Sequence, residues 1–136
     1  MKGSYILLIE LKKDDYIQFG KNHKTFFKKG FYVYVGSALN GLEKRINRHL
    51  RKIKKKHWHV DYFLDFADIV NVFYKENETR DECKIANILD GELEPIQGFG
   101  CSDCKCKTHL FYGSKKNLEG VIKNIKMTFY EINANT

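Results

Sequence analysis

Apolar and polar residues alternate along this chain with two different periods, which predict short strands and amphipathic helices. The strand-like segments are rich in β-branched and aromatic residues and are bounded by glycine, aspartate or charged residues. They cover residues 4–11, 16–20, 31–36, 68–74 and 108–113. The intervening KNHKTFFKKG, with two phenylalanines among lysines, is interpreted as a loop.

The clearest helix follows residue 40. Leucine and isoleucine recur at i, i+4, i+8 and i+11, which places them on one buried stripe: Leu42, Ile46, Leu50 and Ile53. Asn40 followed by Glu43 resembles a capping box and predicts that the helix begins near Gly41. Further helices are predicted over residues 58–67, 79–89 and 115–132.

This order of strands and helices predicts an α+β fold, in which helices flank a small, mostly antiparallel sheet. A chain of 136 residues without a long linker or a repeat fits one domain. Residues 1 to about 90 would form its core, and a cysteine-rich loop, a strand and a helix would follow over about 91–136. No apolar run is long enough to span a membrane, and the first residues lack the features of a signal peptide. We therefore expect a cytoplasmic protein, either a monomer or a weak dimer.

The net charge is concentrated in one segment. Residues 42–56 contain eight Lys or Arg and one Glu, a net charge of +7 that equals the total of the whole chain. Focused positive charge attracts polyanions, so the segment predicts a nucleic-acid partner, with DNA favoured over RNA. The alternative is a solvated helix face. The residues predicted to bind nucleic acid are Arg48, His49, Arg51, Lys52 and Lys55.

Two tyrosine tripeptides lie in the strand segments, GSY at residues 3–5 and YVG at residues 34–36. If these two strands pair, Tyr5 and Tyr34 lie close together near the start of the basic helix. Gly36 would allow a sharp backbone turn there, next to a helix N-terminus that favours anions.

Taken in order, the two tripeptides and an arginine on the next helix resemble the GIY-YIG nuclease superfamily. Four longer stretches resemble a mostly archaeal branch of it, the Uri-like endonucleases or DUF123; they are FYVYVGSA, RINRHLRK, HWHVDYFL and GFGCSDCKCKTHLFY. The resemblance implies a metal-dependent endonuclease that hydrolyses phosphodiester bonds of DNA or RNA. We expect it to be structure-selective or weakly sequence-selective.

The resemblance also implies roles for individual residues. Tyr5 or Tyr34 would orient or deprotonate the attacking water, and Arg45 would clamp the phosphate, with Arg48 as the alternative clamp. Glu82 would hold Mg²⁺ or Mn²⁺, ions that prefer oxygen ligands. Other acidic residues lie close to it in the sequence: Glu76, Glu78 and Asp81.

Family members often carry a histidine after the basic helix that assists water activation, and HWHVDY offers His57 and His59. Either residue would alternatively be structural, hydrogen-bonded to a carbonyl or to Asp61. The asparagine that better-known members have beyond the metal glutamate has no convincing counterpart here. The rest of the metal shell is therefore undefined.

Three cysteines and one histidine lie within nine residues: Cys101, Cys104, Cys106 and His109. Four nitrogen and sulfur ligands would suit tetrahedral zinc. The tight C-x-C spacing and the lack of a second, distant ligand pair favour a packed loop that supports the active site. A redox pair is a third alternative.

Three functions are compatible with these residues. The first is the nuclease, the second is a non-catalytic nucleic-acid-binding module with the same fold, and the third is a protein that docks on a larger repair enzyme. Arg45 and Glu82 separate the first two, because a binding module needs the basic helix but no acidic metal ligand.

Overall fold

The computed structural model describes residues 2–19, 23–38, 40–76, 82–99 and 108–131. The elements over these residues are, in chain order, β1 (Gly3–Leu11), β2 (Asp15–Phe19), β3 (His23–Phe27), β4 (Gly30–Ala38), α1 (Leu42–Leu50), α2 (His59–Phe63), β5 (Asp68–Glu76), α3 (Glu82–Glu92), β6 (Glu94–Pro95), β7 (Leu110–Gly113), α4 (Lys115–Ile125) and β8 (Thr128–Tyr130).

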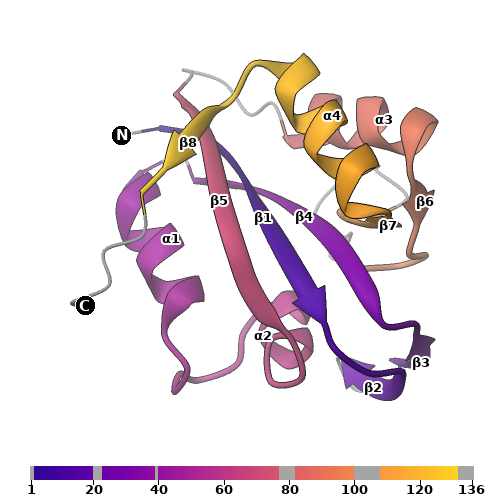
Figure 1. Ribbon diagram of the computed structural model, residues 1–136. Coiled ribbons are helices and arrows are strands. Elements are labelled where there is room, and N and C mark those ends of the chain that lie inside the picture. The colour runs from indigo at the N-terminus through magenta and orange to yellow at the C-terminus, as the bar shows by residue number, and fades with distance from the viewer. Residues whose placement is uncertain (1, 20–22, 39, 77–81, 100–107, 132–136) are drawn as a thin grey trace.

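Within the described residues, six strands form one sheet in the order β6-β7-β4-β1-β5-β8 (Figure 1). Every neighbouring pair in it is antiparallel. The hairpin β2-β3 forms a separate two-stranded sheet. The predicted α+β fold with a mostly antiparallel sheet is confirmed.

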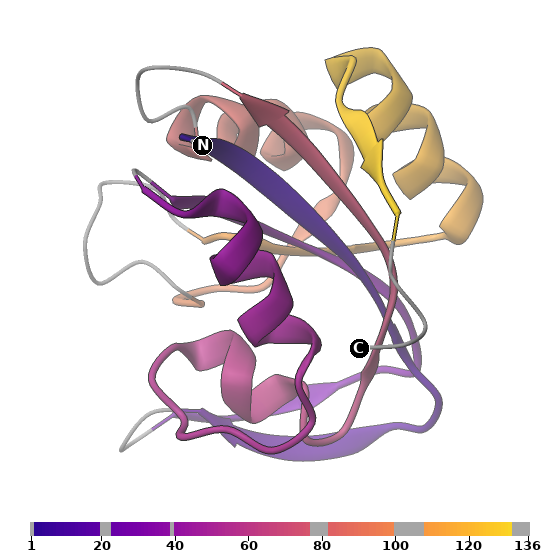
Figure 2. The same cartoon turned by 90° about the vertical axis from the view of Figure 1, so that its left-hand side faces the viewer.

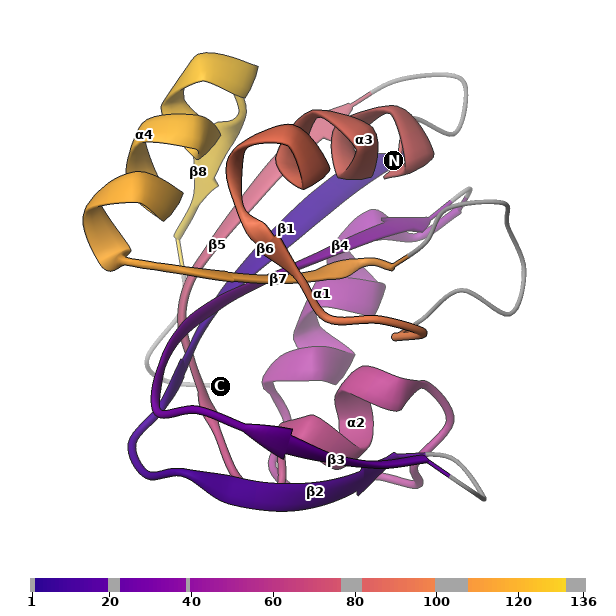
Figure 3. The same cartoon turned by 90° about the vertical axis from the view of Figure 1, so that its right-hand side faces the viewer.

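Helices cover both faces of the sheet. Figure 2 shows α1, α2 and the β2-β3 hairpin together on one face, whereas Figure 3 shows α3 and α4 on the other. Strand β1 lies at the centre and supplies both cores, since successive side chains point to opposite faces. Leu7 and Ile9 pack toward α1 and α2, and Ile6 and Leu8 pack toward α3 and α4.

One predicted element is wrong, and another is longer in the prediction than in the structure. The segment interpreted as a lysine-rich loop contains β3, whose alternation of exposed Phe26 with buried Phe27 is that of a half-buried strand. The last helix is shorter than predicted. It ends at Ile125, Lys126 adopts a left-handed conformation with φ 63°, and β8 then pairs with β5.

Helix α1 begins where it was predicted, after Gly41, but its cap and its C-terminal end differ from the prediction. Its N-cap is Gly41, with φ 71°, so no side chain caps the helix in the manner of a capping box. The helix ends at Leu50, and Ile53 beyond it is 94% exposed instead of buried. Among the described residues, no helix is both long and apolar enough to cross a membrane.

Candidate active site

A buried tyrosine–histidine pair joins the sheet to the basic helix. The hydroxyl of Tyr5 on β1 lies 2.7 Å from Nε2 of His49 in the last turn of α1. Each of the two residues is 2% exposed. Tyr5 is opposite Gly36 in the β1–β4 register, which confirms the predicted pairing of these strands.

Gly36 makes this contact sterically possible. A Cβ atom at this position would collide with the ring of Tyr5. The predicted backbone turn at Gly36 is wrong, because β4 continues through it to Ala38. The absence of a side chain at Gly36 leaves space above β4. The Tyr5 ring occupies this space, and its hydroxyl contacts His49 of α1.

His49 is neutral at neutral pH. Its pKa is lowered to about 3, mainly by burial and also by the nearby cations Lys54, Arg48 and Arg45, while the charge of Asp61 opposes the shift. Nδ1 of His49 is buried and has no hydrogen-bond partner within the described part of the chain. The imidazole thus acts here as a hydrogen-bonding group and not as a cation.

Tyr34 lies on the same side of the sheet and is 6% exposed. Its ring centroid is 6.1 Å from that of His49 and 6.2 Å from that of Phe99. Tyr5 and Tyr34 therefore both reach His49, as the prediction that they lie together requires. They face the last turn of α1, however, and not its N-terminus.

Trp58 lies under two arginines of α1. The guanidinium carbons of Arg45 and Arg48 are each 4.5 Å from the centre of its ring system, and the ring of His49 is 5.6 Å away. Nη1 of Arg45 also donates to the carbonyl of Ser37 at 2.9 Å. Cation–π contact and this hydrogen bond hold Arg45 above the end of β4.

Asp61 anchors the loop between α1 and α2. Both terminal guanidinium nitrogens of Arg48 donate to its carboxylate, at 3.1 and 3.0 Å, as do the backbone N–H groups of His57 and Trp58, at 2.7 and 2.9 Å. Burial alone would raise the pKa of Asp61, but these hydrogen bonds and the Arg48 charge leave it below its usual value. Arg48 is therefore engaged with a carboxylate, and Arg45 is the better placed of the two to meet a phosphate.

The histidine that contacts Tyr5 is not one of the two predicted for catalysis. His57 is exposed, and its ring lies 4.8 Å from that of Trp58. His59 begins α2, so the segment is not extended there, and its ring packs 5.0 Å from Phe19. His49 was predicted to bind nucleic acid. Its spacing from Leu42 and Ile46 (i+7 and i+3) could have placed it on the buried stripe.

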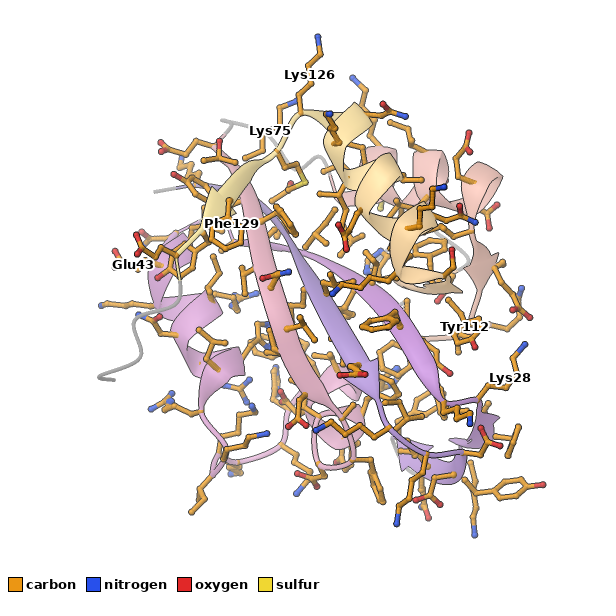
Figure 4. The ribbon with its side chains drawn as sticks, in the orientation of Figure 1. Lys28, Glu43, Lys75, Tyr112, Lys126 and Phe129 are labelled. Carbon is orange, nitrogen blue, oxygen red and sulfur yellow. The ribbon has the colours of Figure 1, made fainter. Side chains whose placement is uncertain are left out.

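The remaining basic residues surround the exposed side of α1. Arg51, Lys52 and Lys55 are exposed, and Lys52 forms an ion pair with Asp68 at 2.6 Å. A groove of about 350 Å³ runs along the helix and is lined by Asn40, Gly41, Lys44, Arg45, Arg48 and Arg51. Lys28 also lies over an aromatic ring, that of Tyr112, but this contact is on the opposite side of the molecule from Glu43 of α1 (Figure 4).

The predicted metal ligands are only partly described. Glu82 is the first residue of α3, which packs on the opposite face of the sheet, and its side chain is outside the described residues. Cys101, Cys104 and Cys106 are also outside them. His109 is buried, and its backbone joins Phe99 and Val35. Among the described side chains, no three or more His, Cys, Asp or Glu residues form a group that could hold a metal.

The fold and the site define a small α+β domain with a buried tyrosine–histidine pair behind an arginine-rich helix. A family model, described as domain of unknown function DUF123, matches residues 4–131, and the chain belongs to this family. Neither the comparison with curated proteins nor that with solved structures found a match.

Proposed function

We propose that this protein is an endonuclease that hydrolyses phosphodiester bonds of DNA or RNA with the help of Mg²⁺ or Mn²⁺. The observation that carries the proposal is the buried 2.7 Å contact between Tyr5 and His49, next to the Trp58 ring that Arg45 covers. Membership of DUF123 and the resemblance of the ordered residues to GIY-YIG nucleases support it.

We assign phosphate binding to Arg45. Its guanidinium has five N–H donors in a fork that matches two oxygens of a phosphate. The hydrogen bond to the carbonyl of Ser37 limits its conformations, which lowers the entropy lost when a phosphate binds. The other cations of the α1 groove would hold the adjacent backbone phosphates.

We assign to Tyr5 the role of orienting or deprotonating the attacking water. When the phenol donates its proton to Nε2 of His49, its oxygen would accept a hydrogen bond from a water that reaches it after the movement described below. A pKa of about 3 makes His49 a weak base in the free protein. A bound phosphate would bring negative charge close to the imidazole, raise its pKa and so favour proton transfer from the phenol.

The proposal requires a movement. Tyr5, Tyr34 and His49 are 2%, 6% and 2% exposed, so a phosphate does not reach them in this conformation. Trp58 is partly exposed and packs against His49, which makes it the side chain that substrate would displace.

Glu82 is assigned as the metal ligand because of the resemblance of the sequence to GIY-YIG nucleases. Asp61, the buried carboxylate closest to the arginines, does not supply a ligand, because Arg48 and two backbone N–H groups occupy both of its oxygens. A bound Mg²⁺ or Mn²⁺ would act as a Lewis acid on the leaving oxygen.

A second candidate function is a non-catalytic nucleic-acid-binding module. Burial of both tyrosines favours it, since the exposed face of α1 is basic whether or not the tyrosines become accessible. Such a module needs the α1 surface but neither Tyr5 nor Glu82.

A cleavage assay distinguishes the two. Labelled flapped, branched, single-stranded and duplex DNA and RNA are incubated with Mg²⁺, Mn²⁺ or EDTA. The variants are Arg45→Ala and Glu82→Ala, and the controls are Lys116→Ala, an exposed cation on α4, and Glu92→Ala at the other end of α3. Metal-dependent cleavage that only Arg45→Ala and Glu82→Ala abolish supports the nuclease. Salt-sensitive binding without cleavage, weakened by Arg45→Ala alone, supports the module.

A further inference from the structure

An isoleucine stands fully in solvent inside the most basic segment of the chain. Helix α1 ends at Leu50, and the backbone of Arg51 is extended, so the next turn of helix does not form. Ile53 is 94% exposed as a result. Single exposed apolar residues are common on proteins, but this one lies in a stretch where five of the six residues 51–56 are Lys or Arg.

Ile53 also forms part of a groove. A groove of about 830 Å³ on α1 has Leu50 and Ile53 as its apolar residues, and its polar residues are Lys44, Asn47, Arg48, Arg51 and Lys52. Lys44, Arg48 and Arg51 also line the neighbouring groove that contains Arg45. The basic surface is thus continuous from Gly41 to Ile53, with an apolar side chain at one end.

We propose that Ile53 is a wedge that enters between two bases of a nucleic acid whose backbone the α1 surface holds. This inference rests on the proposed function and names its substrate class, a duplex interrupted by a nick, a flap or a mismatch. Proteins that insert aliphatic side chains between base steps combine them with cations on the flanking phosphates, which is the combination found here.

The cost of unstacking bases and the gain from burying Ile53 together explain why the duplex must be interrupted. Separating a stacked base step in an intact duplex costs about as much as burying one isoleucine returns, or more. A single Ile53 therefore does not open a continuous duplex. At a nick, flap or mismatch the stacking is already weakened, so the burial of Ile53 favours binding there.

The position of the wedge relative to Arg45 is limited by the chain. Five residues of helix separate Arg45 from Leu50, which is about 7.5 Å along the axis. The three residues to Ile53 add at most about 11 Å. At about 3.4 Å per base pair, Ile53 enters within about five base pairs of the phosphate that Arg45 holds.

The test measures base unstacking directly. Flapped and continuous duplexes carry 2-aminopurine at successive positions, one to eight pairs from the flap, and the protein is added in EDTA. We expect the fluorescence to rise several-fold at one step within about five base pairs of the branch, and only in the flapped duplex. Ile53→Ala should abolish this rise and weaken binding to the flapped duplex about five- to tenfold, while affinity for the continuous duplex stays the same.

Controls separate the wedge from the phosphate contacts. Ile88→Ala removes another exposed isoleucine, 47% exposed on α3 at the opposite face of the sheet, and should change neither fluorescence nor affinity. Ile53→Ala should leave the slope of log affinity against log salt unaltered, whereas Arg45→Ala should reduce its magnitude by about one. Because Ile53 is exposed, its replacement should leave the melting temperature unchanged.

Three outcomes overturn the inference. In the first, the fluorescence rise persists in Ile53→Ala, and in the second no rise occurs although the protein binds or cleaves a flapped duplex. The third is Ile53-dependent binding to phosphatidylserine vesicles without binding to DNA or RNA, which would assign the same residues to a membrane surface. Since EDTA excludes turnover, loss of catalysis leaves the inference intact. Absence of all nucleic-acid binding overturns the proposed function as well.

Discussion

The two faces of the sheet differ in what they bury. Strand β1 sends Ile6 and Leu8 to a core that α3 and α4 close mainly with aliphatic side chains. On the other face, Tyr5 reaches a cluster that contains aromatic rings and the buried polar groups of His49 and Asp61. Buried polar groups are costly unless they are paired. The core beneath α3 and α4 therefore contributes mainly to stability, whereas the core beneath α1 and α2 also contains buried hydrogen-bonding and titratable groups.

The largest effect is expected at Asp61. Asp61→Ala leaves the half-buried Arg48 charge without its carboxylate partner and two backbone N–H groups without an acceptor. We expect the free energy of unfolding to fall by about 3–5 kcal/mol. Asp65→Ala, which breaks the exposed ion pair with Lys56, should cost far less. Urea denaturation measures both, and equal losses would contradict the account of Asp61.

Replacement of glycine should have opposite signs on the two faces. Gly36→Ala places a Cβ in the Tyr5 ring and should lower the free energy of unfolding by about 1–3 kcal/mol. On α4, a Cβ at Gly120 meets nothing within 4 Å, so Gly120→Ala should raise it by about 0.5–1 kcal/mol. Thermal melts of both variants decide the point. A stable Gly36→Ala protein would show that the ring has room.

The α1–α2 face should also make stability depend on pH. The folded pKa of His49, about 3, is below its ordinary 6.5. As the pH falls below about 6.5, the unfolded chain therefore takes up the proton first, and stability is lost until the pH reaches about 3. The loss should be roughly 2 kcal/mol between pH 6.5 and pH 5.

His49→Gln should remove this loss, and His57→Gln, at an exposed position, should retain it. Urea denaturation at a series of pH values measures each slope. An unchanged slope in His49→Gln would show that His49 is not the group responsible. The contribution of Asp61, whose folded pKa is lowered, should be lost only at lower pH, as its carboxylate becomes protonated.

The smallest effect should be spectroscopic. Trp58 is the only tryptophan in the chain, so its fluorescence reports this cluster alone. Flapped DNA added in EDTA should shift or quench the emission, because substrate must displace the ring to reach Tyr5. In Arg45→Ala the change should require higher DNA concentrations. Emission that stays constant at saturating DNA would contradict the proposed movement.

Sequence reasoning succeeded where local pattern decides structure. Segments with alternating β-branched residues became β1, β4, β5 and β7. It failed at β3, where lysines mask the alternation, and at β8, which exists because residues far away in β5 offer a pairing edge. Long-range pairing of this kind leaves little signal in a short segment.

The candidate site divides in the same way. The pairing of the two tyrosine strands and the basic helix could be predicted from residue order. The role of Gly36 could not, since it depends on the ring opposite in β1. The engagement of Arg48 with Asp61 depends on the path of the loop between α1 and α2, which the sequence pattern did not reveal.

The most direct test of the central claim compares two neighbouring tyrosines. Tyr74 is opposite Tyr5 in the β1–β5 register, and its ring faces Tyr130. Single-turnover cleavage of flapped DNA is measured for Tyr5→Phe and Tyr74→Phe at saturating protein. The account predicts that Tyr5→Phe lowers the rate by about 10²-fold or more with little change in affinity, whereas Tyr74→Phe stays within about twofold. Equal rates in the two variants would contradict it.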